Sequence, residues 1–396
     1  KLTVSTKLVS SVYTIGRDAF EPRPFNILQE ENAGAGIRSR VEATMERWSL
    51  QGGFEAYYDT YKAKTFENLQ PTNGSEQGPL LTTVKHPRSY LNLFAESKFE
   101  IDTNLLVSVG ANVNLTSYKI ENSFPSSLDS DNTLDPIVSP RISVTYGINS
   151  SMNLYATLSR GFSPLSVDDS TNPDGSLNGE LKPETGWNRE IGIKRASRRA
   201  NLELSLYSMD IRNLLVTRRT AEDIVFGVNA GETRHNGIEV DIEALVLDGP
   251  KSQIIADMSY SLSDFEFETF VDDNADFSGN QLTGVPKHQL SFDLRYEVNW
   301  FFTGINYQFV DQIPITDDNS VFSDNYQLVN LHAGTDLSFG EKLSVDVVVR
   351  LNNVLDEKYA SMLSINANSF GGNEPRYYYP GLPLNFQTSV SIAYRL

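Results

Sequence analysis

The stretch Asn104–Ser117, NLLVSVGANVNLTS, alternates between apolar and small polar residues. One face carries Leu105, Val107, Val109, Ala111, Val113 and Leu115, and the other carries Asn104, Ser108, Gly110, Asn112, Asn114 and Thr116, with Leu106 as the one exception. A period of two residues predicts a β-strand with one apolar face. The same alternation recurs along residues 342–352 and 384–396. One such strand also fits a soluble sandwich, so the length and spacing of the strands must decide the fold.

The alternation predicts sixteen antiparallel strands. They lie at residues 2–15, 33–45, 47–60, 89–101, 104–119, 140–149, 151–160, 187–196, 200–218, 232–247, 251–267, 287–298, 300–311, 325–339, 342–359 and 384–396. Many of these segments are far longer than the roughly 5–6 residues of a typical soluble strand. They are long enough to cross a bilayer, for which a tilted strand needs about 9–11 residues.

The connections between these strands alternate between short and long. Short turns are predicted at 149–151, 248–251, 298–300 and 340–342, and long polar stretches at 16–32, 61–88, 120–139, 161–186, 219–231, 268–286, 312–324 and 360–383. Outer-membrane barrels have short periplasmic turns and long external loops. The sequence therefore predicts an all-β, transmembrane antiparallel barrel over residues 1–396, with both termini on the periplasmic side.

Composition narrows the class of protein further. The 396 residues contain no cysteine and carry a formal net charge of −18. The missing cysteines exclude disulfide scaffolds and thiol chemistry, and the acidic balance argues against nucleic-acid binding, which needs a basic face. No run approaches the roughly 18 apolar residues of a spanning helix, so a membrane could be crossed only by a closed barrel. The start at Lys1, without Met or an apolar signal core, is interpreted as a mature or truncated N-terminus.

Several segments resemble the C-terminal barrel region of TonB-dependent outer-membrane receptors, particularly those for ferric siderophores. The matching blocks occur in the family's order: LYATLSRGFSPLSVDD (154–169), LKPETGWNREIGIK (181–194), VNAGETRHNGIEVDIEA (228–244), LTGVPKHQLSFDLRYE (282–297), LNNVLDEKYA (351–360) and YYPGLPLNFQTSVSIAYRL (378–396). Each block is a weak signal alone, whereas the ordered set is strong. It extends from about residue 154 to the C-terminus.

The resemblance also exposes two departures. Family barrels have 22 strands and an N-terminal plug preceded by a short box that binds TonB, and neither the plug nor the first six strands is visible here. The sequence is then a fragment, or a second chain completes the barrel; a self-closed barrel of 16 strands is also geometrically allowed. The chain ends in Leu396, where the family usually ends in an aromatic residue, although Tyr394 is close by.

By this resemblance, the expected function is active uptake of a large, scarce nutrient across the outer membrane of a Gram-negative bacterium, with a ferric siderophore as the expected nutrient. TonB would act through the plug, and the barrel would contact outer-membrane lipid and lipopolysaccharide. No enzymatic activity and no cofactor are expected, the ligand itself being a ferric chelate; Gly-x-Ser-x-Gly is absent. Two alternatives remain: a receptor-like barrel serving as a structural subunit of an envelope assembly, and a passive pore of sixteen strands.

Tyrosines supply the best ligand candidates in the sequence. Tyr57, Tyr58 and Tyr61 approach the outer end of a predicted strand, and Arg376, Tyr377, Tyr378 and Tyr379 lie in the last external loop. Tyrosine offers a stacking area with a polar tip, which suits an organic chelate. The competing interpretation is the aromatic girdle at the lipid headgroups. Arg160 and Phe162 could line the upper lumen or fix a loop.

Other candidate residues favour structural roles. His86, His235, His288 and His332 show no metal-ligand spacing with one another, so no metal site is predicted. The external loops are rich in acidic residues, which could bind divalent cations beside lipopolysaccharide, attract a cationic ligand or simply solvate the loops. These residues are Asp129, Asp131, Asp135, Asp168, Asp169, Asp174, Asp272, Asp273, Asp276, Asp317, Asp318 and Asp324.

Overall fold

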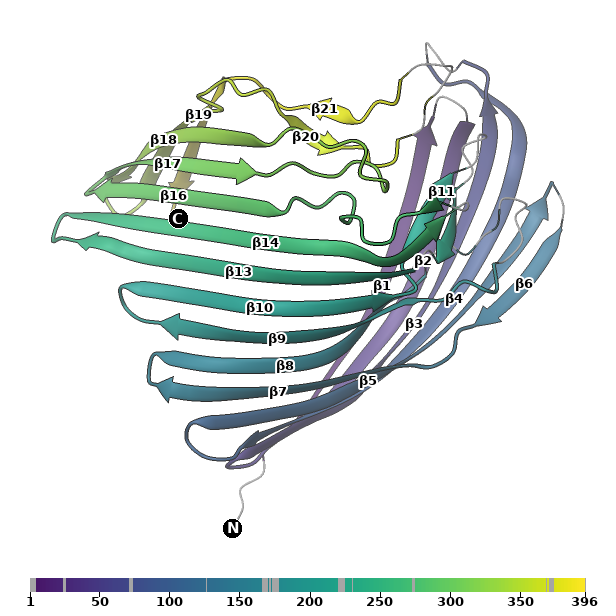
Figure 1. Ribbon diagram of the computed structural model, residues 1–396, viewed down its shortest axis with the longest axis horizontal. Helices are drawn as coiled ribbons and strands as arrows, with labels where there is room; N and C mark the ends of the chain where they lie inside the picture. Colours follow the sequence, from purple (N-terminus) through teal and green to yellow (C-terminus); the bar gives the residue numbers. More distant parts are fainter. Residues whose placement is uncertain are drawn as a thin grey trace. The chain divides into compact units, whose positions relative to one another are not determined.

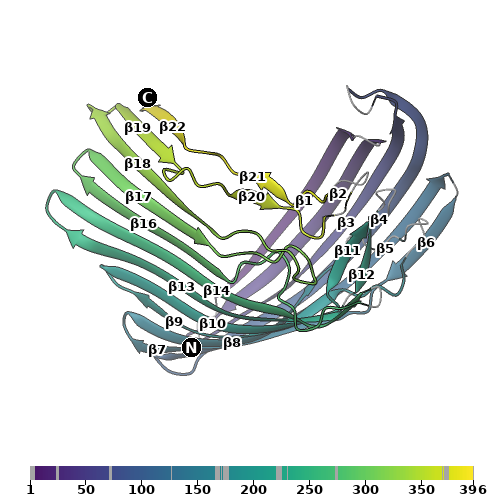
Figure 2. The same cartoon turned by 45° about the horizontal axis from the view of Figure 1, so that its top comes forward.

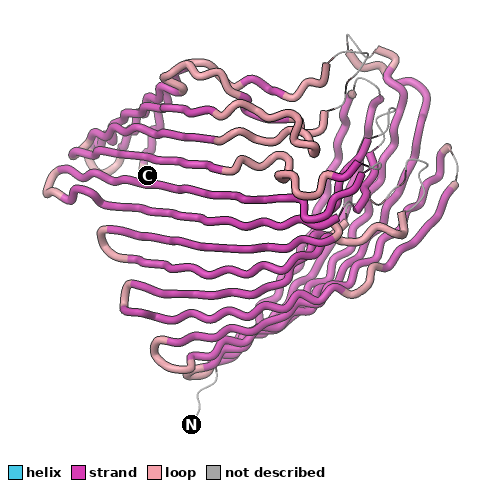
Figure 3. The backbone as a smooth tube through the Cα atoms, viewed as in Figure 1, coloured by secondary structure: helices cyan, strands magenta, loops and turns pink. Residues whose placement is uncertain are grey.

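The computed structural model consists of antiparallel strands joined by turns and loops (Figure 3). It describes residues 5–23, 26–70, 74–125, 127–165, 170, 172, 178–219, 225–229, 231–272, 275–367, 369 and 374–395. The predicted Asp168, Asp169, Asp174 and Asp273 lie outside these residues. Within the described part of the chain, no helix is long and apolar enough to span a membrane.

Among the residues that the structure describes, sixteen strands are long, in agreement with the predicted number. They are β1 (Ser5–Pro22), β2 (Asn26–Thr44), β3 (Trp48–Asn68), β4 (Gln77–Glu100), β5 (Leu105–Phe124), β7 (Ile137–Asn149), β8 (Met152–Ser163), β9 (Glu184–Ala196), β10 (Ala200–Arg212), β13 (Gly231–Asp248), β14 (Ser252–Asp272), β16 (His288–Val298), β17 (Phe301–Val310), β18 (Tyr326–Phe339), β19 (Leu343–Asn352) and β22 (Asn385–Tyr394). The six others are short: β6 (Leu128–Thr133), β11 (Leu215–Arg219), β12 (Val225–Asn229), β15 (Ala275–Asp276), β20 (Ala360–Leu363) and β21 (Tyr378–Pro380).

The chain divides into two compact units. The first comprises Lys1–Val144, Thr157–Trp187 and Arg212–Ala230, and the second comprises Thr145–Ala156, Asn188–Ile211 and Gly231–Leu396. In the first, β1 to β5 pair in sequence order as an antiparallel meander (Figures 1 and 2). In the second, β13 and β14 continue through β16, β17, β18 and β19 to β22 in the same manner.

Both units expose large apolar side chains and bury some polar ones. Val12 and Phe386 are 75% and 78% exposed, whereas Asp59 and Asn114 are 4% and 6% exposed. Residues that pair across strands are of the same kind: Leu115 lies opposite Leu91, and Asn114 lies opposite Asn92. We call the two sides of each meander the apolar face and the polar face. The alternation predicted from residues 104–117 and 384–396 is confirmed.

The short turns occur where they are predicted. Ser150 and Ser151, the 249–251 segment, and Asn299 and Trp300 each connect two long strands. Asn299 and Gly340 adopt positive φ values of 49° and 68°, a conformation that asparagine and glycine accept with little strain. Tight reversal at these positions lets the neighbouring strands pair directly.

Several predicted strand ends are wrong, mainly on the side of the long connections. The first strand continues to Pro22 instead of residue 15, and the fourth begins at Gln77 instead of residue 89. Much of the predicted loops at 16–32, 61–88 and 120–139 is therefore paired strand. Apolar alternation fades where both faces are polar, but backbone pairing with a neighbouring strand still stabilises the extended conformation.

Two predicted strands are too long because asparagines with positive φ interrupt them. The 200–218 segment breaks at Asn213 (φ 57°), and β11 then pairs separately with β12. The 342–359 segment ends at Asn352, since the buried Asn353 has a φ of 51°. The Asn353 side chain donates to the Glu357 and Leu382 carbonyls at 2.8 and 3.1 Å, which fixes this turn.

Candidate functional site

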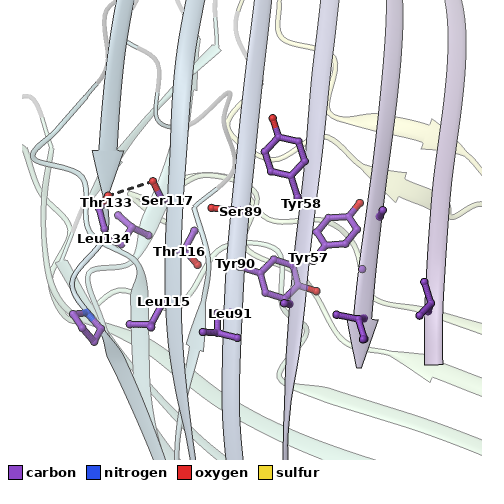
Figure 4. A pocket seen from close by; sticks show the side chains of 16 residues that line it. Tyr57, Tyr58, Ser89, Tyr90, Leu91, Leu115, Thr116, Ser117, Thr133 and Leu134 are labelled. Atoms are coloured by element: carbon purple, nitrogen blue, oxygen red, sulfur yellow. Dashed lines mark hydrogen bonds between the residues drawn. The ribbon is translucent and has the colours of Figure 1, made fainter. Parts of the chain in front are cut away.

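The polar face of β1 to β5 carries a row of stacked tyrosines. Register places Tyr13 opposite Gly36, Gly36 opposite Tyr57, and Tyr57 opposite Tyr90. The Tyr13 and Tyr57 rings stack at 5.9 Å, and the Tyr57 and Tyr90 rings lie 5.3 Å apart. Three aromatic rings from three strands thus form one continuous surface; Figure 4 shows Tyr57 and Tyr90 beside each other.

Two glycines in β2 make room for this surface. A Cβ atom on Gly36 would lie 2.4 Å from the Tyr13 ring, and one on Gly34 would lie 2.5 Å from the Tyr57 hydroxyl oxygen. Any side chain at these positions would therefore push the rings away from the sheet. The glycines let Tyr13 and Tyr57 lie flat against β2.

Charged pairs border the tyrosine row on both sides. On one side the Glu55 carboxylate accepts hydrogen bonds from the Tyr13 hydroxyl at 2.9 Å and from Arg38 at 2.7 Å. On the other, Arg88 donates to both oxygens of the buried Asp59 at 3.0 and 3.2 Å. A two-pronged guanidinium–carboxylate pair holds both side chains in fixed positions. The face therefore offers an aromatic surface between two polar anchors.

One further row extends this face away from Glu55. The Tyr61 hydroxyl donates to Glu30 at 2.7 Å, and Arg17 lies 3.5 Å from the same carboxylate. The Tyr61 ring is 5.8 Å from that of His86, its register partner in β4. Tyr61 is thus part of the polar face, two rows beyond Tyr57.

The structure separates the predicted tyrosines of β3. Tyr57 and Tyr61 lie on the polar face, whereas the adjacent Tyr58 points to the apolar face and is 55% exposed. All three lie within β3 and not at its end. This placement supports a ligand role for Tyr57 and Tyr61 and the girdle interpretation for Tyr58.

Arg160 and Phe162 lie at the end of β8. By alternation they share the face of the exposed Leu154 and Leu158, and the Arg160 guanidinium donates to the Val138 carbonyl at 2.9 Å. This contact joins Arg160 to the backbone of strand β7, and both predicted roles of Arg160 and Phe162 stay predictions.

The last loop holds the remaining candidates, Arg376, Tyr377 and Tyr378. Tyr378 belongs to β21, which pairs with β20, and its ring meets that of Tyr377 edge to face at 6.2 Å. Arg376 and Tyr378 are exposed, while Tyr377 is half-buried. These three residues all belong to the second unit.

The histidines have structural neighbours. His235 Nε2 lies 3.0 Å from the Thr233 hydroxyl oxygen, and His288 Nδ1 lies 2.9 Å from that of Tyr260. Among the described residues no group of three or more His, Asp or Glu side chains is arranged to hold a metal ion.

Sequence reasoning missed Tyr13, Tyr90 and the ion pairs that border them. They join Tyr57 only through the register of four strands, and no local pattern sets that register. A usable signal was present within β3 itself, because Glu55, Asp59 and Tyr61 share the parity of Tyr57.

Residues 10–354 match the family described as "TonB dependent receptor-like, beta-barrel". The chain belongs to this family. TonB-dependent receptors are receptors and transporters and not enzymes, and their barrels present the apolar face to lipid. The polar face with its tyrosine row is therefore the one directed away from the bilayer.

Individual relatives agree with this family and with the fold. An uncharacterized TonB-dependent receptor of Haemophilus influenzae is 32% identical over 133 residues, which are 32% of this chain and 35% of that protein. The ferrichrome outer membrane transporter/phage receptor of Escherichia coli is 23% identical over 238 residues, covering 58% and 30% of the two chains. The chain thus spans only part of the length of these relatives.

Solved structures share the fold at low sequence identity. The unliganded ferric citrate transporter FecA superimposes with a TM-score of 0.78 at 15% identity, over 98% of this chain and 59% of that one. The siderophore receptor PiuA of Acinetobacter baumannii gives 0.73 at 14% identity, over 98% and 62%. These similarities confirm the TonB-dependent receptor barrel as the fold.

Proposed function

We propose that this chain is the barrel part of an outer-membrane transporter that takes up a ferric siderophore. TonB would supply energy through a plug outside the sequence described, and upstream strands or a second chain would complete the barrel. The observation that carries the proposal is the stacked row of Tyr13, Tyr57 and Tyr90 on the polar face. Membership in the receptor family supports this proposal. The names of several similar proteins, which include ferrichrome, ferric pyoverdine and ferric citrate, support it as well.

The chemistry of this face suits a large, rigid chelate. Aromatic rings with hydroxyl tips provide contact area with little loss of conformational freedom. The Arg38–Glu55 and Arg88–Asp59 pairs on either side provide directed donors, so that a chelate with peripheral oxygens could be oriented above the rings. Nothing in this arrangement calls for bond-making chemistry.

Uptake of radioactive iron in a deletion strain carrying the complete gene tests the proposal. For a panel of ferric chelates, we expect uptake of at least one chelate that stops when the proton gradient is dissipated. The double substitution Tyr57→Ala/Tyr90→Ala should weaken uptake several-fold, because an aromatic contact contributes about 0.5–1.5 kcal/mol beyond its buried area.

A matched control is Tyr296→Ala, since Tyr296 lies on the apolar face of β16, opposite Thr303. Its uptake should equal that of the wild type at equal protein level. Uptake of no chelate, or uptake that ignores the proton gradient, would contradict the transport proposal. A large steady current in planar bilayers would point instead to a passive pore.

A further inference from the structure

The tyrosine row of Tyr13, Tyr57 and Tyr90 lies on a polar face whose nearby charges cancel. Within the described strands β1 to β5, this face carries four arginines, and each lies within salt-bridge distance of a carboxylate. The pairs are Arg17 with Glu30 at 3.5 Å, Arg38 with Glu55 at 2.7 Å, Arg40 with Glu42 at 2.6 Å and Arg88 with Asp59 at 3.0 Å. The two lysines of the face, Lys7 and Lys98, lie six and eight residues along their strands from Tyr13 and Tyr90. The rings are therefore bordered by ion pairs and not by free cations.

A carboxylate lies on each side of the row within β3 itself. Glu55 and Asp59 are two residues before and after Tyr57 and share its face, which places each about 7 Å from it along the strand at roughly 3.3 Å per residue. The Glu55 carboxylate also accepts a hydrogen bond from the Tyr13 hydroxyl at 2.9 Å, and the Asp59 side chain is buried. An anion resting on the rings would lie between these two carboxylates, with no free cation to offset the loss of its hydration.

Uncharged groups continue the face on β4 and β5. Asn92 lies opposite Glu55, and Asn114 lies opposite Asn92. The Asn114 amide donates to the Asn92 Oδ1 atom at 2.8 Å, and the Thr116 hydroxyl donates to the Asn114 Oδ1 atom at 2.8 Å. Carboxamides and hydroxyls both donate and accept hydrogen bonds without a charge. This side of the row therefore adds polarity but no cation.

Ferric chelates differ chiefly in charge. Three hydroxamate groups each lose one proton when they bind ferric iron, so their complex is neutral. Three catecholate groups each lose two protons and leave a complex with three negative charges, and ferric complexes of citrate-type carboxylates are also anionic. A polar face without a free cation accommodates the neutral complex at a much smaller desolvation cost.

We propose that the tyrosine row selects an uncharged ferric chelate of the hydroxamate class and rejects the polyanionic catecholate and carboxylate chelates. The inference rests on the proposed function, because it names the substrate class of the same site. Glu55 and Asp59 cause the rejection, since like charges set against a competitor produce specificity as effectively as contacts with the preferred ligand. Arg38 and Arg88 keep donors for neutral oxygens at the rim of the chelate, because a guanidinium has five N–H groups and neither pair uses all of them.

Equilibrium dialysis of the complete receptor with radioactive iron tests this proposal, using a ferric trihydroxamate and a ferric tricatecholate as the two probes. The wild type should bind the trihydroxamate at least about tenfold more tightly, because each charge of the tricatecholate would lie near two carboxylates. Its affinity for the neutral probe should hardly change between low and high salt, since screening acts only on charged ligands.

Two variants each remove one carboxylate and leave an arginine unpaired. Glu55→Gln frees Arg38, and Asp59→Asn frees Arg88. Each should shift the ratio of the two affinities toward the tricatecholate at least about fivefold. Heat-modified mobility in gel electrophoresis verifies that each variant is folded, and Glu55→Gln carries the test if the buried Asp59 does not tolerate substitution.

Glu96→Gln is the matched control, with the same change in charge on the same face of β4. Glu96 is six residues from Tyr90, about 20 Å along the strand at roughly 3.3 Å per residue, which exceeds the screening length of about 10 Å at moderate salt. This variant should keep the wild-type preference. A shift as large as that of Glu55→Gln would assign the effect to the total charge and not to the row.

Two further results would overturn the substrate class. One is wild-type binding of the tricatecholate, or of a ferric citrate complex, as tight as that of the trihydroxamate. The other is an unchanged preference in the folded carboxylate variants. Uptake of an anionic chelate that depends on the proton gradient would reject this inference and leave the transport proposal standing, whereas binding of no chelate would overturn both.

Discussion

The strands β1 to β5 are much longer than the C-terminal strands β16, β17, β19 and β22, although both sets are long enough to cross a bilayer. The first five strands contain 18 to 24 residues, whereas β16, β17, β19 and β22 contain 10 or 11. About 9–11 residues suffice to cross a bilayer. The C-terminal strands are therefore little longer than the membrane requires, and the N-terminal strands continue well beyond it as paired sheet.

The parts of these two regions that extend beyond the membrane are therefore stabilised by different interactions. In β1 to β5 the backbone ladder continues, and polar side chains occupy both faces, as at Tyr61 and Lys62. In the C-terminal region, side-chain bonds connect loops: the Asp317 carboxylate accepts from the Thr283 hydroxyl at 2.5 Å and from the Asn366 amide at 3.1 Å. Asn319 adds reciprocal bonds with the Gln281 backbone.

The largest expected effect on stability comes from a substitution in the middle of the short strand β19. Val347 lies on the apolar face opposite Val390, and its neighbour Val348 lies on the polar face opposite Ser389. Val347→Arg should lower the free energy of unfolding by about 2–4 kcal/mol near the bilayer midplane. Val348→Arg should change it far less. Denaturant titration in lipid vesicles measures both, and equal losses would contradict the assignment of faces.

Arginine substitutions at two positions along the long strand β3 should show where the membrane ends. Phe54 and Thr60 share the apolar-face parity of β3. We expect Phe54→Arg to cost about 2–4 kcal/mol and Thr60→Arg about 0–1 kcal/mol, because the penalty falls toward the interface. The same vesicle titration applies. A penalty at Thr60 as large as that at Phe54 would place the outer half of β3 in lipid.

The polar face of the long strands should depend on its buried carboxylate. Arg88→Met leaves Asp59, which is 4% exposed, without its cation, and we expect a loss of roughly 1–3 kcal/mol. In the C-terminal region Lys287 and Asp264 form an exposed pair at 2.8 Å, so Lys287→Met should cost no more than about 1 kcal/mol. Asp59→Asn in the Arg88→Met background should recover part of the stability.

The smallest expected effect is the pH dependence of the hydrogen bonds to Asp318 in a C-terminal loop. The hydroxyl of Thr316, followed by the amide and hydroxyl of Ser320, holds the pKa of Asp318 below its ordinary value. These bonds are complete above the usual aspartate range and are lost as pH falls through the lowered pKa. The Ser320 amide resonance should titrate at that pH, and at a higher one in Thr316→Val. The β1 to β5 extension, held by backbone bonds, should not respond.

Period-two alternation was sufficient to predict the strand number and the two faces. In each membrane strand, successive side chains face lipid and polar surroundings in turn. Adjacent residues such as Val113 and Asn114 therefore show the two faces in the local sequence. Strand ends were harder, because outside the membrane both faces are polar and the local signal disappears. Asn213 and Asn353 interrupt strands through positive φ values that composition alone does not reveal.

The sequence by itself predicted an antiparallel β-barrel, since alternation and turn spacing are properties of neighbouring residues, and its ordered motif blocks carried the resemblance to TonB-dependent receptors. Only the tertiary structure decided which residues meet across strands. Tyr13, Tyr57 and Tyr90 are separated by more than thirty residues from one strand to the next, and Asp59 and Arg88 by more than twenty. Their contacts depend on register, which is set by the pairing of whole strands and by the turns between them.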